Sequence, residues 1–232
     1  MIPFEQIEII LDTEFKEFSH QLLPRGGGSG GGSVYMDLAK KKILKVIFNM
    51  ESFEYEKNVA EFISSQQDIP LPYVIQIYPE IQAILFENKF KDGETLNKFL
   101  EKKKLSEYDK KLQCSNLISA LKNLHSNNIF HGDLKLSNII VDPKSLQVQF
   151  IDLGSMGFST QKSFDLTRTT KSNLPPQIDK SIIHLLSCTF EEKIKLDEYA
   201  MFLILIKINP DESLDYLEKN GQFAATQIIN RF

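Results

Sequence analysis

A stretch in the middle of the chain gathers residues that could handle an anionic substrate. Asp133 is followed two residues later by Lys135 and five residues later by Asn138, and a second aspartate, Asp152, comes 19 residues after the first. Carboxylate and amide oxygens are ligands that Mg²⁺ takes in proteins. A nearby lysine can offset negative charge on a bound group. The alternative is a polar turn between two strands, but these four residue types rarely coincide by chance at such spacings.

The elements around these residues can be predicted from the hydrophobic pattern. Two short apolar runs, 138–142 and 148–152, predict strands joined by the turn-forming Asp142-Pro143-Lys144-Ser145. Upstream, the segment 108–128 carries leucines mostly along one stripe and predicts an amphipathic helix. A strand-turn-strand unit would therefore place Asn138 at its start and Asp152 at its end.

The same residues carry a resemblance to a known family. The chain reads His131-Gly132-Asp133-Leu134-Lys135-Leu136-Ser137-Asn138 and then Phe150-Ile151-Asp152-Leu153-Gly154. This resembles the catalytic loop (H-R-D-x-K-x-x-N) and the metal-binding motif (D-F-G) of the eukaryotic-type protein kinases.

The resemblance implies a role for each residue in phosphoryl transfer. Asp133 would orient the hydroxyl nucleophile, Asn138 and Asp152 would hold Mg²⁺, and Lys135 would offset charge on the transferred group. In this family, a lysine two residues after the catalytic aspartate goes with Ser/Thr specificity. The first expectation is therefore a Ser/Thr protein kinase that uses ATP and Mg²⁺, with Mn²⁺ as an alternative metal.

A lysine on an upstream strand resembles the phosphate-binding lysine of the family. A lysine-rich turn separates two β-prone runs within 34–48 and predicts a hairpin, with Lys45 on its second strand. Its partner should be a glutamate on the core-facing side of the following helix, predicted at 51–63. Glu56 shares the apolar face, whereas Glu61 lies on the polar side. The sixteen-residue spacing from Lys45 to Glu61 fits the family better than the eleven residues to Glu56, so both stay open, with Glu56 preferred.

The next apolar run, 81–87, predicts a buried strand that leads into a hinge-like segment. By resemblance, Phe86 would be the gatekeeper, and the backbone from Glu87 to Lys89 would bind the adenine edge. Val34 would pack on the adenine from the other lobe.

The repeat GGGSGGGS at 26–33 sits where the family has its phosphate-covering glycine loop. Aligned on Val34, Gly27 and Gly32 take the outer glycine places, and Ser29 takes the middle one. So regular a repeat is typical of a flexible, engineered linker, and a native loop is the alternative. If the repeat is engineered, we expect reduced nucleotide affinity.

The C-terminal part shows one further match and several departures. Asp197-Glu198-Tyr199-Ala200 resembles the start of the central C-lobe helix, where the aspartate braces the catalytic loop; a plain helix cap is the alternative for Asp197.

Gly132 replaces the arginine that pairs with a phosphorylated activation segment, so we expect no need for that phosphorylation. Leu153 replaces phenylalanine, and Gln177 replaces the glutamate that closes the segment. Only 24 residues follow Ile208, as in bacterial effector kinases and other reduced kinases.

Together these features predict an α+β, bilobal, protein-kinase-like fold. We expect a β-rich N-lobe with one main helix over residues 1–88. A mainly α-helical C-lobe, truncated after its central helix, would occupy residues 89–232. An activating protein partner would compensate for the reduced C-lobe.

Composition limits the other function classes. With 42% hydrophobic residues, 25% charged residues and a net charge of −4, the chain is neither disordered nor a typical nucleic-acid binder. Two cysteines form no disulfide framework, and no apolar run is long enough to span a membrane, which predicts a cytoplasmic protein, or one delivered to a host cytoplasm. Two alternatives to an active protein kinase stay open: a pseudokinase or scaffold, favoured by the departures above, and a small-molecule phosphotransferase of the aminoglycoside or choline kinase type, disfavoured by Lys135 and the Asp197 motif.

Overall fold

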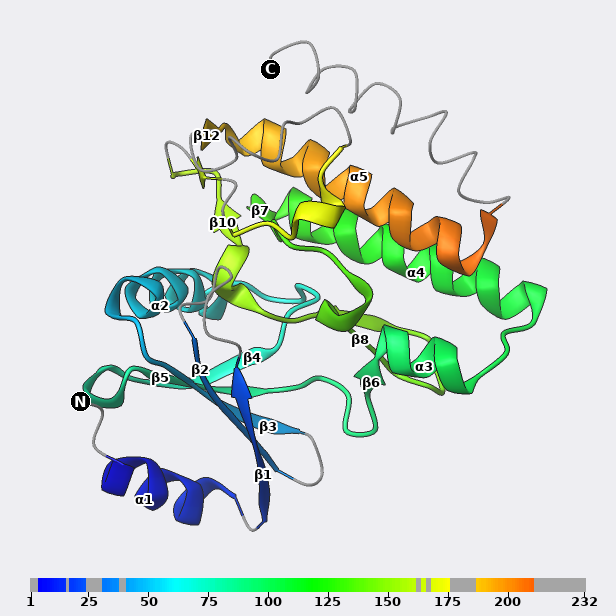
Figure 1. Cartoon of the computed structure of the whole chain (residues 1–232). Coiled ribbons are helices and arrows are strands. Elements are labelled where there is room, and N and C mark those ends of the chain that lie inside the picture. Colours follow the sequence, from blue (N-terminus) through cyan, green and yellow to red (C-terminus); the bar gives the residue numbers. More distant parts are fainter. Residues whose placement is uncertain are drawn as a thin grey trace.

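The computed structural model shows a small, sheet-based lobe and a larger, mainly helical lobe (Figure 1). It describes residues 4–15, 17–23, 31–37, 41–161, 164–165, 168–175 and 187–210. Gly27 and Ser29 of the glycine repeat, and Gln177 at the end of the activation segment, lie outside these residues.

A five-stranded antiparallel sheet forms the smaller lobe, with strand order β1-β2-β3-β5-β4. The predicted hairpin is confirmed, because β2 and β3 pair with Val34 opposite Lys45. The edge strand β4 was not predicted, since prolines surround it and much of it is exposed, as edge strands often are. The strands are β1 (Phe18–Leu23), β2 (Gly32–Asp37), β3 (Lys42–Ile47), β4 (Tyr73–Tyr78) and β5 (Ala83–Glu87).

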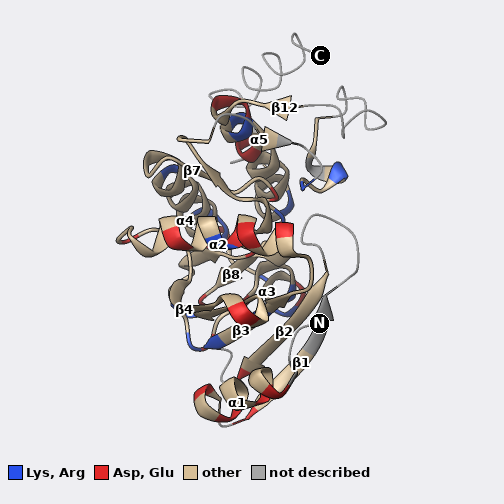
Figure 2. Cartoon of the chain, turned by 90° about the vertical axis from the view of Figure 1, so that its left-hand side faces the viewer, with Lys and Arg blue, Asp and Glu red and all other residues tan. Residues whose placement is uncertain are grey.

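Two helices pack against this sheet, where one main helix was predicted. The predicted one, α2 (Met50–Ser64), begins at Asn49, whose side chain accepts a hydrogen bond from the Ser52 amide. The additional helix, α1 (Phe4–Glu14), carries four acidic residues and no Lys or Arg (Figure 2). Its apolar side joins a separate core cluster with the sheet: Ile7, Leu11, Phe15, Tyr35, Leu44, Val46, Ile81, Ala83 and Leu85.

The larger lobe is built around two long helices that lie side by side, α4 (Glu107–Ser126) and α5 (Phe190–Ile208) (Figure 1). The predicted strand pair is confirmed: β8 (Ile139–Val141) pairs with β9 (Val148–Phe150), and β6 (Glu94–Thr95) pairs with β8. The main core cluster runs from α2 and β5 through β8 and β9 into α4 and α5, so apolar packing joins the two lobes. The other α-helix and strands of the described residues are α3 (Leu96–Lys102), β7 (Ile129–Phe130), β10 (Gly157–Phe158), β11 (Phe164–Asp165) and β12 (Ser187–Cys188).

Helix α5 begins earlier than the sequence pattern indicated. Its N-cap is Thr189, which forms a reciprocal capping box with Glu192. Asp197 therefore lies inside the helix, and both the expected helix start and the alternative role as a helix cap are wrong. The first turns of α5 are rich in charged residues, so the apolar pattern alone did not indicate that the helix begins there.

None of the described helices is long and apolar enough to cross a membrane.

Candidate active site

A cavity of about 650 Å³ lies between the sheet and the catalytic loop and is large enough for a nucleotide. It brings together residues from both lobes that are far apart in the sequence. Those predicted as site residues are Val34, Lys45, Glu56, Phe86, Lys135, Asn138 and Asp152.

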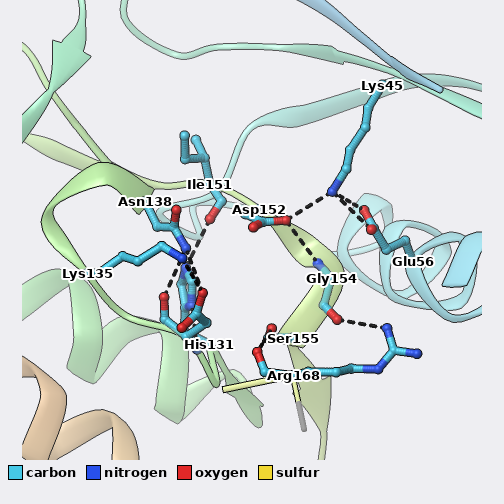
Figure 3. A network of polar contacts seen from close by, with 11 residues as sticks. Lys45, Glu56, His131, Lys135, Asn138, Ile151, Asp152, Gly154, Ser155 and Arg168 are labelled. Atoms are coloured by element: carbon cyan, nitrogen blue, oxygen red, sulfur yellow. Dashed lines mark hydrogen bonds and ion pairs between the residues drawn. The ribbon is translucent and has the colours of Figure 1, made fainter. Parts of the chain in front are cut away.

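A buried lysine joins two carboxylates at the inner end of this cavity (Figure 3). Lys45 Nζ lies 2.9 and 2.7 Å from the two carboxylate oxygens of Glu56 and 3.0 Å from Asp152 Oδ1. The Glu56 side chain is fully buried, whereas Glu61 is exposed on the other side of α2. The partner of Lys45 is thus Glu56, as the helix-face argument favoured, and the shorter spacing in sequence does not prevent the contact.

The charges in this network shift one another's protonation. Lys45 lowers the pKa of Asp152 to about 2, although burial acts in the opposite direction. Burial alone would lower the pKa of Lys45, but the two carboxylates outweigh it and the pKa is raised. Burial raises the pKa of Glu56, and Lys45 opposes that shift. Lys45 and Asp152 therefore stay charged at neutral pH.

Asp152 occupies a backbone conformation that L-residues rarely adopt. Its φ is 74°, and its Oδ1 accepts a weak hydrogen bond from the Gly154 amide at 3.4 Å. The contacts from Gly154 and Lys45 hold this strained residue with its carboxylate at the cavity.

The carboxylate of Asp133 is positioned by three donors. Its Oδ2 accepts from Lys135 Nζ at 2.6 Å and from Asn138 Nδ2 at 3.3 Å, and its Oδ1 accepts from the Thr170 amide at 2.8 Å. Lys135 Nζ also contacts the Thr170 hydroxyl at 3.3 Å. Since each carboxylate oxygen can accept more than one hydrogen bond, Asp133 can still take a hydroxyl donor.

Asp197, in α5, holds the loop that carries Asp133 through hydrogen bonds to its backbone. The two carboxylate oxygens of Asp197 accept hydrogen bonds from the backbone N–H groups of His131 (2.6 Å) and Gly132 (2.8 Å). His125 Nε2 lies 3.2 Å from Asp197 Oδ2. His131 connects this loop to the metal-binding motif, because its Nε2 contacts the Ile151 carbonyl at 3.0 Å while its Nδ1 accepts from the Asp133 amide. The bracing expected from the resemblance thus comes from the middle of α5.

The donor set suits a magnesium ion. Asn138 directs Nδ2 at Asp133, which leaves its amide oxygen on the opposite side, and Asp152 presents a carboxylate to the same cavity (Figure 3). No group of three or more His, Cys, Asp or Glu able to hold a metal occurs in the described part of the chain. One or two protein oxygens completed by phosphate and water is the arrangement that Mg²⁺ favours at nucleotide sites. The residues therefore fit Mg²⁺, and Asn138 and Asp152 would hold it.

The hinge differs from the expectation. Val34 and Phe86 line the cavity, but the Asn88 amide donates to the Lys41 carbonyl at 2.7 Å, and the Lys89 amide donates to Gln149 Oε1 at 2.7 Å. Gln149 Nε2 in turn donates to Asn88 Oδ1.

Three predicted nucleotide-binding residues are therefore not placed at the cavity. Glu87 pairs with Lys41, and neither Glu87 nor Lys89 is among the described residues that line it. Gly32 lies in β2, where an added Cβ would meet the Val46 carbonyl oxygen at 2.1 Å, so this glycine is required by strand packing.

Several residues in or next to the site were not recognised from the sequence. Thr170 contacts both Asp133 and Lys135. Arg168 contacts Gly154 in the loop that begins at Asp152, called the metal-binding loop below after the family motif. The Gln149 side chain accepts the Lys89 amide of the hinge. Thr170 lies in a segment rich in serine and threonine, so the sequence gives no reason to single it out. Gln149 offered a signal, because a glutamine in the middle of an apolar strand needs buried hydrogen-bond partners.

Comparisons with known proteins agree with this geometry. Residues 26–181 match the family model described as protein kinase domain. The chain is 23% identical over 140 residues to calcium-dependent protein kinase 4 of Plasmodium falciparum (58% of this chain, 26% of that protein) and 38% identical over 91 residues to the serine/threonine-protein kinase ppk25 of Schizosaccharomyces pombe (39% and 21%). It is 24% identical over 137 residues to the carbon catabolite-derepressing protein kinase of Candida glabrata (58% and 21%).

The matched regions span about a quarter or less of the length of these relatives. The family model, by contrast, covers more than half of this chain. The predicted α+β, bilobal kinase-like fold is confirmed, and the chain belongs to the protein kinase domain family.

Proposed function

We propose that this domain transfers the γ-phosphoryl group of ATP to serine and threonine hydroxyls of protein substrates, with Mg²⁺ as its metal. The observation that carries the proposal is the convergence on one cavity of Lys45, Asp152 and Asn138, with Asp133 directly behind Asn138. Positioning and charge neutralisation are the main demands of phosphoryl transfer, and these residues supply both.

The proposed pose follows from the lining of the cavity. The base would lie between Val34 and Ile140 near Phe86, and the phosphates would extend toward Lys45. When bound, Mg²⁺ would neutralise charge on the phosphate oxygens. Asp133 would accept the hydrogen bond of the attacking hydroxyl, and Lys135, which already contacts Asp133, would offset charge on the transferred group.

We further propose that this is a kinase without the catalytic-loop arginine of the family. Its N-lobe would end near residue 88. Gly132 brings no cation to the catalytic loop, so an activating protein partner is a natural complement to such a domain.

A radioactive transfer assay tests the proposal. The protein is incubated with γ-labelled ATP, Mg²⁺ and a generic basic protein, beside Asp133→Ala, Asp152→Ala and the matched control Asp92→Ala, whose aspartate is 61% exposed. We expect labelled phosphoserine or phosphothreonine with the wild type and with Asp92→Ala, and none with the two site variants. Equal transfer by Asp133→Ala, or transfer only to a small alcohol or amine, would contradict the proposal.

A scaffold domain that binds nucleotide weakly or not at all is the second candidate function. It is favoured by the hinge, where the N–H groups of Asn88 and Lys89 are already engaged. Calorimetric titration with ATP and Mg²⁺ separates the two functions, because a scaffold would bind nucleotide weakly or not at all and would transfer no phosphate.

A further inference from the structure

The catalytic loop lacks the cation that would hold a phosphorylated activation segment, and its backbone leaves no room for one. Gly132 has φ of 78°, and a Cβ built there would lie 2.3 Å from the Ser155 carbonyl oxygen. Any side chain at residue 132 would therefore clash and be strained. The activation segment, which is described here for residues 152–161, 164–165 and 168–175, therefore needs another group to hold it in place.

Arg168, within that segment, contacts both the metal-binding loop and helix α2. Its Nη1 donates to the Gly154 carbonyl at 3.0 Å (Figure 3), and its guanidinium carbon lies 4.2 Å from the centre of the Tyr55 ring. The Ser155 hydroxyl donates to the Arg168 carbonyl, which ties the two parts of the segment together. A planar guanidinium suits this combination of stacking and hydrogen bonding, which an ammonium cannot reproduce.

Tyr55 contacts the activation segment at two points. Its hydroxyl donates to the Met156 carbonyl, so the residue next to Glu56 on α2 contacts the activation segment through both its ring and its oxygen. A displacement of Arg168 would therefore also disturb α2, the helix that positions Glu56 against Lys45.

The two residues after Arg168 continue into the catalytic loop. Thr169 donates its hydroxyl to the Gly132 carbonyl at 2.8 Å, and the Thr170 amide donates to Asp133. Residues 168–170 therefore bridge α2, the metal-binding loop and the catalytic loop, with Arg168 at the α2 end.

We propose that Arg168 is a positioning residue that fastens the activation segment to α2 and to the metal-binding loop, so that the segment needs no phosphate to hold Asp133 and Asp152 in place. This inference rests on the proposed kinase function. It assigns to an arginine of the segment itself the fastening that a cation at residue 132 would otherwise provide. Burial raises the pKa of Glu56, and the positive charge of Arg168 acts against that rise, which agrees with this assignment.

The test compares Arg168→Ala, Arg168→Lys and the exposed control Lys144→Ala after phosphatase treatment of all proteins. We expect the treated wild type and Lys144→Ala to keep full activity. Arg168→Ala should lose about 10- to 100-fold in kcat with a KM for ATP changed by less than about threefold, since the lost contacts position groups and do not touch ATP. Arg168→Lys should recover less than half of the loss, and added guanidinium at millimolar concentration should partly restore Arg168→Ala but not Asp133→Ala.

Hydrogen exchange supplies a readout that does not depend on catalysis. In Arg168→Ala, the Thr170 amide should exchange at least about tenfold faster than in the wild type, with unchanged exchange in α4. Wild-type exchange and kcat in Arg168→Ala, or loss of wild-type activity on phosphatase treatment, would overturn the inference. If the wild type transfers no phosphate at all, the kinase proposal fails, and the exchange result alone then decides whether Arg168 fastens the segment.

Discussion

The two ends of the cavity are built on different principles. At the end near Lys135, side chains carry the polar contacts: the carboxylates of Asp133 and Asp152 accept hydrogen bonds from lysine or amide donors. Asn138 donates to Asp133, and Asn138 and Asp152 line the cavity. At the hinge end, recognition of a base would depend on backbone N–H groups, and those of Asn88 and Lys89 are already satisfied within the protein. The residues proposed to hold phosphate and metal, Lys45, Asn138 and Asp152, thus line the cavity, whereas the hinge N–H groups of Asn88 and Lys89 are engaged within the protein. Substitutions at the two ends should therefore affect different kinetic constants.

The largest effect is expected at the catalytic carboxylate. Asp133→Asn should keep the fold, because the amide is isosteric, but lower kcat by about 10²- to 10⁴-fold, since an amide cannot accept the hydroxyl proton. Steady-state phosphate transfer with a protein substrate measures this. Asp92→Asn, on the surface, is the control, and a kcat for Asp133→Asn within about threefold of the wild type would remove Asp133 from its proposed role.

The next effect concerns the buried ion pair. Glu56→Gln should lower kcat/KM for ATP by about 10- to 100-fold, because Lys45 would keep Asp152 as its only charged partner among the described contacts. Lys45→Met should also destabilise the fold by about 3 kcal/mol, since it leaves Glu56 buried without its cation.

Glu61→Gln on the same helix is the matched control for this pair. Kinetics and urea unfolding of the three variants check both expectations. If Glu61→Gln reduced kcat/KM as strongly as Glu56→Gln, the assignment of the partner would be wrong.

A smaller effect is expected from the brace below the catalytic loop. Asp197→Asn places an NH₂ group against one of the backbone N–H groups of His131 and Gly132, which both donate to Asp197. We expect a loss of about 1–3 kcal/mol in unfolding free energy and a reduced kcat, because a charge-assisted acceptor is lost. Thermal unfolding beside Glu191→Gln, exposed in the first turn of α5, measures it, and an unchanged Tm would refute the bracing role.

The ion pair also predicts a pH dependence of stability. The pKa of Asp152 is lowered from its ordinary 3.8 to about 2, so its contribution is complete above pH 4 and is lost as the pH falls through 2. The side chain is 36% exposed, so we expect about 1 kcal/mol rather than the full linkage value. Urea unfolding from pH 5 to pH 2 should show a steeper loss for the wild type than for Asp152→Asn. Parallel curves would show that Lys45 does not lower this pKa.

The smallest effect is expected at the hinge. Gln149→Leu releases the Lys89 amide toward the cavity, so the KM for ATP should fall about two- to fivefold with kcat unchanged. Gln147→Leu, at an exposed residue just before β9, is the control. A lower kcat, or a higher KM, would mean that Gln149 supports the catalytic end as well.

The sequence predicted which side chains meet around Asp133 and Asp152, because these residue types stand at fixed spacing. Asp133, Asn138 and Asp152 bracket a strand pair whose apolar pattern is unambiguous, and the core-facing side of α2 pointed to Glu56 before any contact was known. The hinge could not be predicted in the same way. The Asn88 N–H is engaged by the Lys41 carbonyl, and the Lys89 N–H is engaged by Gln149, which is 60 residues further along the chain.

The remaining misses have similar physical causes. The start of α5 was set by the Thr189 cap rather than by apolar periodicity, and β4 is an edge strand without a clear alternation. Helix α1 was not predicted, although its apolar positions pack on the sheet. Arg168 could not be singled out, because its importance comes from a long-range contact with Tyr55.

The most direct test of the account is whether Asn138 and Asp152 together hold a divalent ion against the triphosphate. Electron paramagnetic resonance of Mn²⁺ can measure metal binding with and without ATP in the wild type, Asn138→Ala and Asp152→Asn. We expect ATP-dependent Mn²⁺ binding in the wild type that weakens by at least about tenfold in each variant. Equal Mn²⁺ affinity in all three proteins would contradict it.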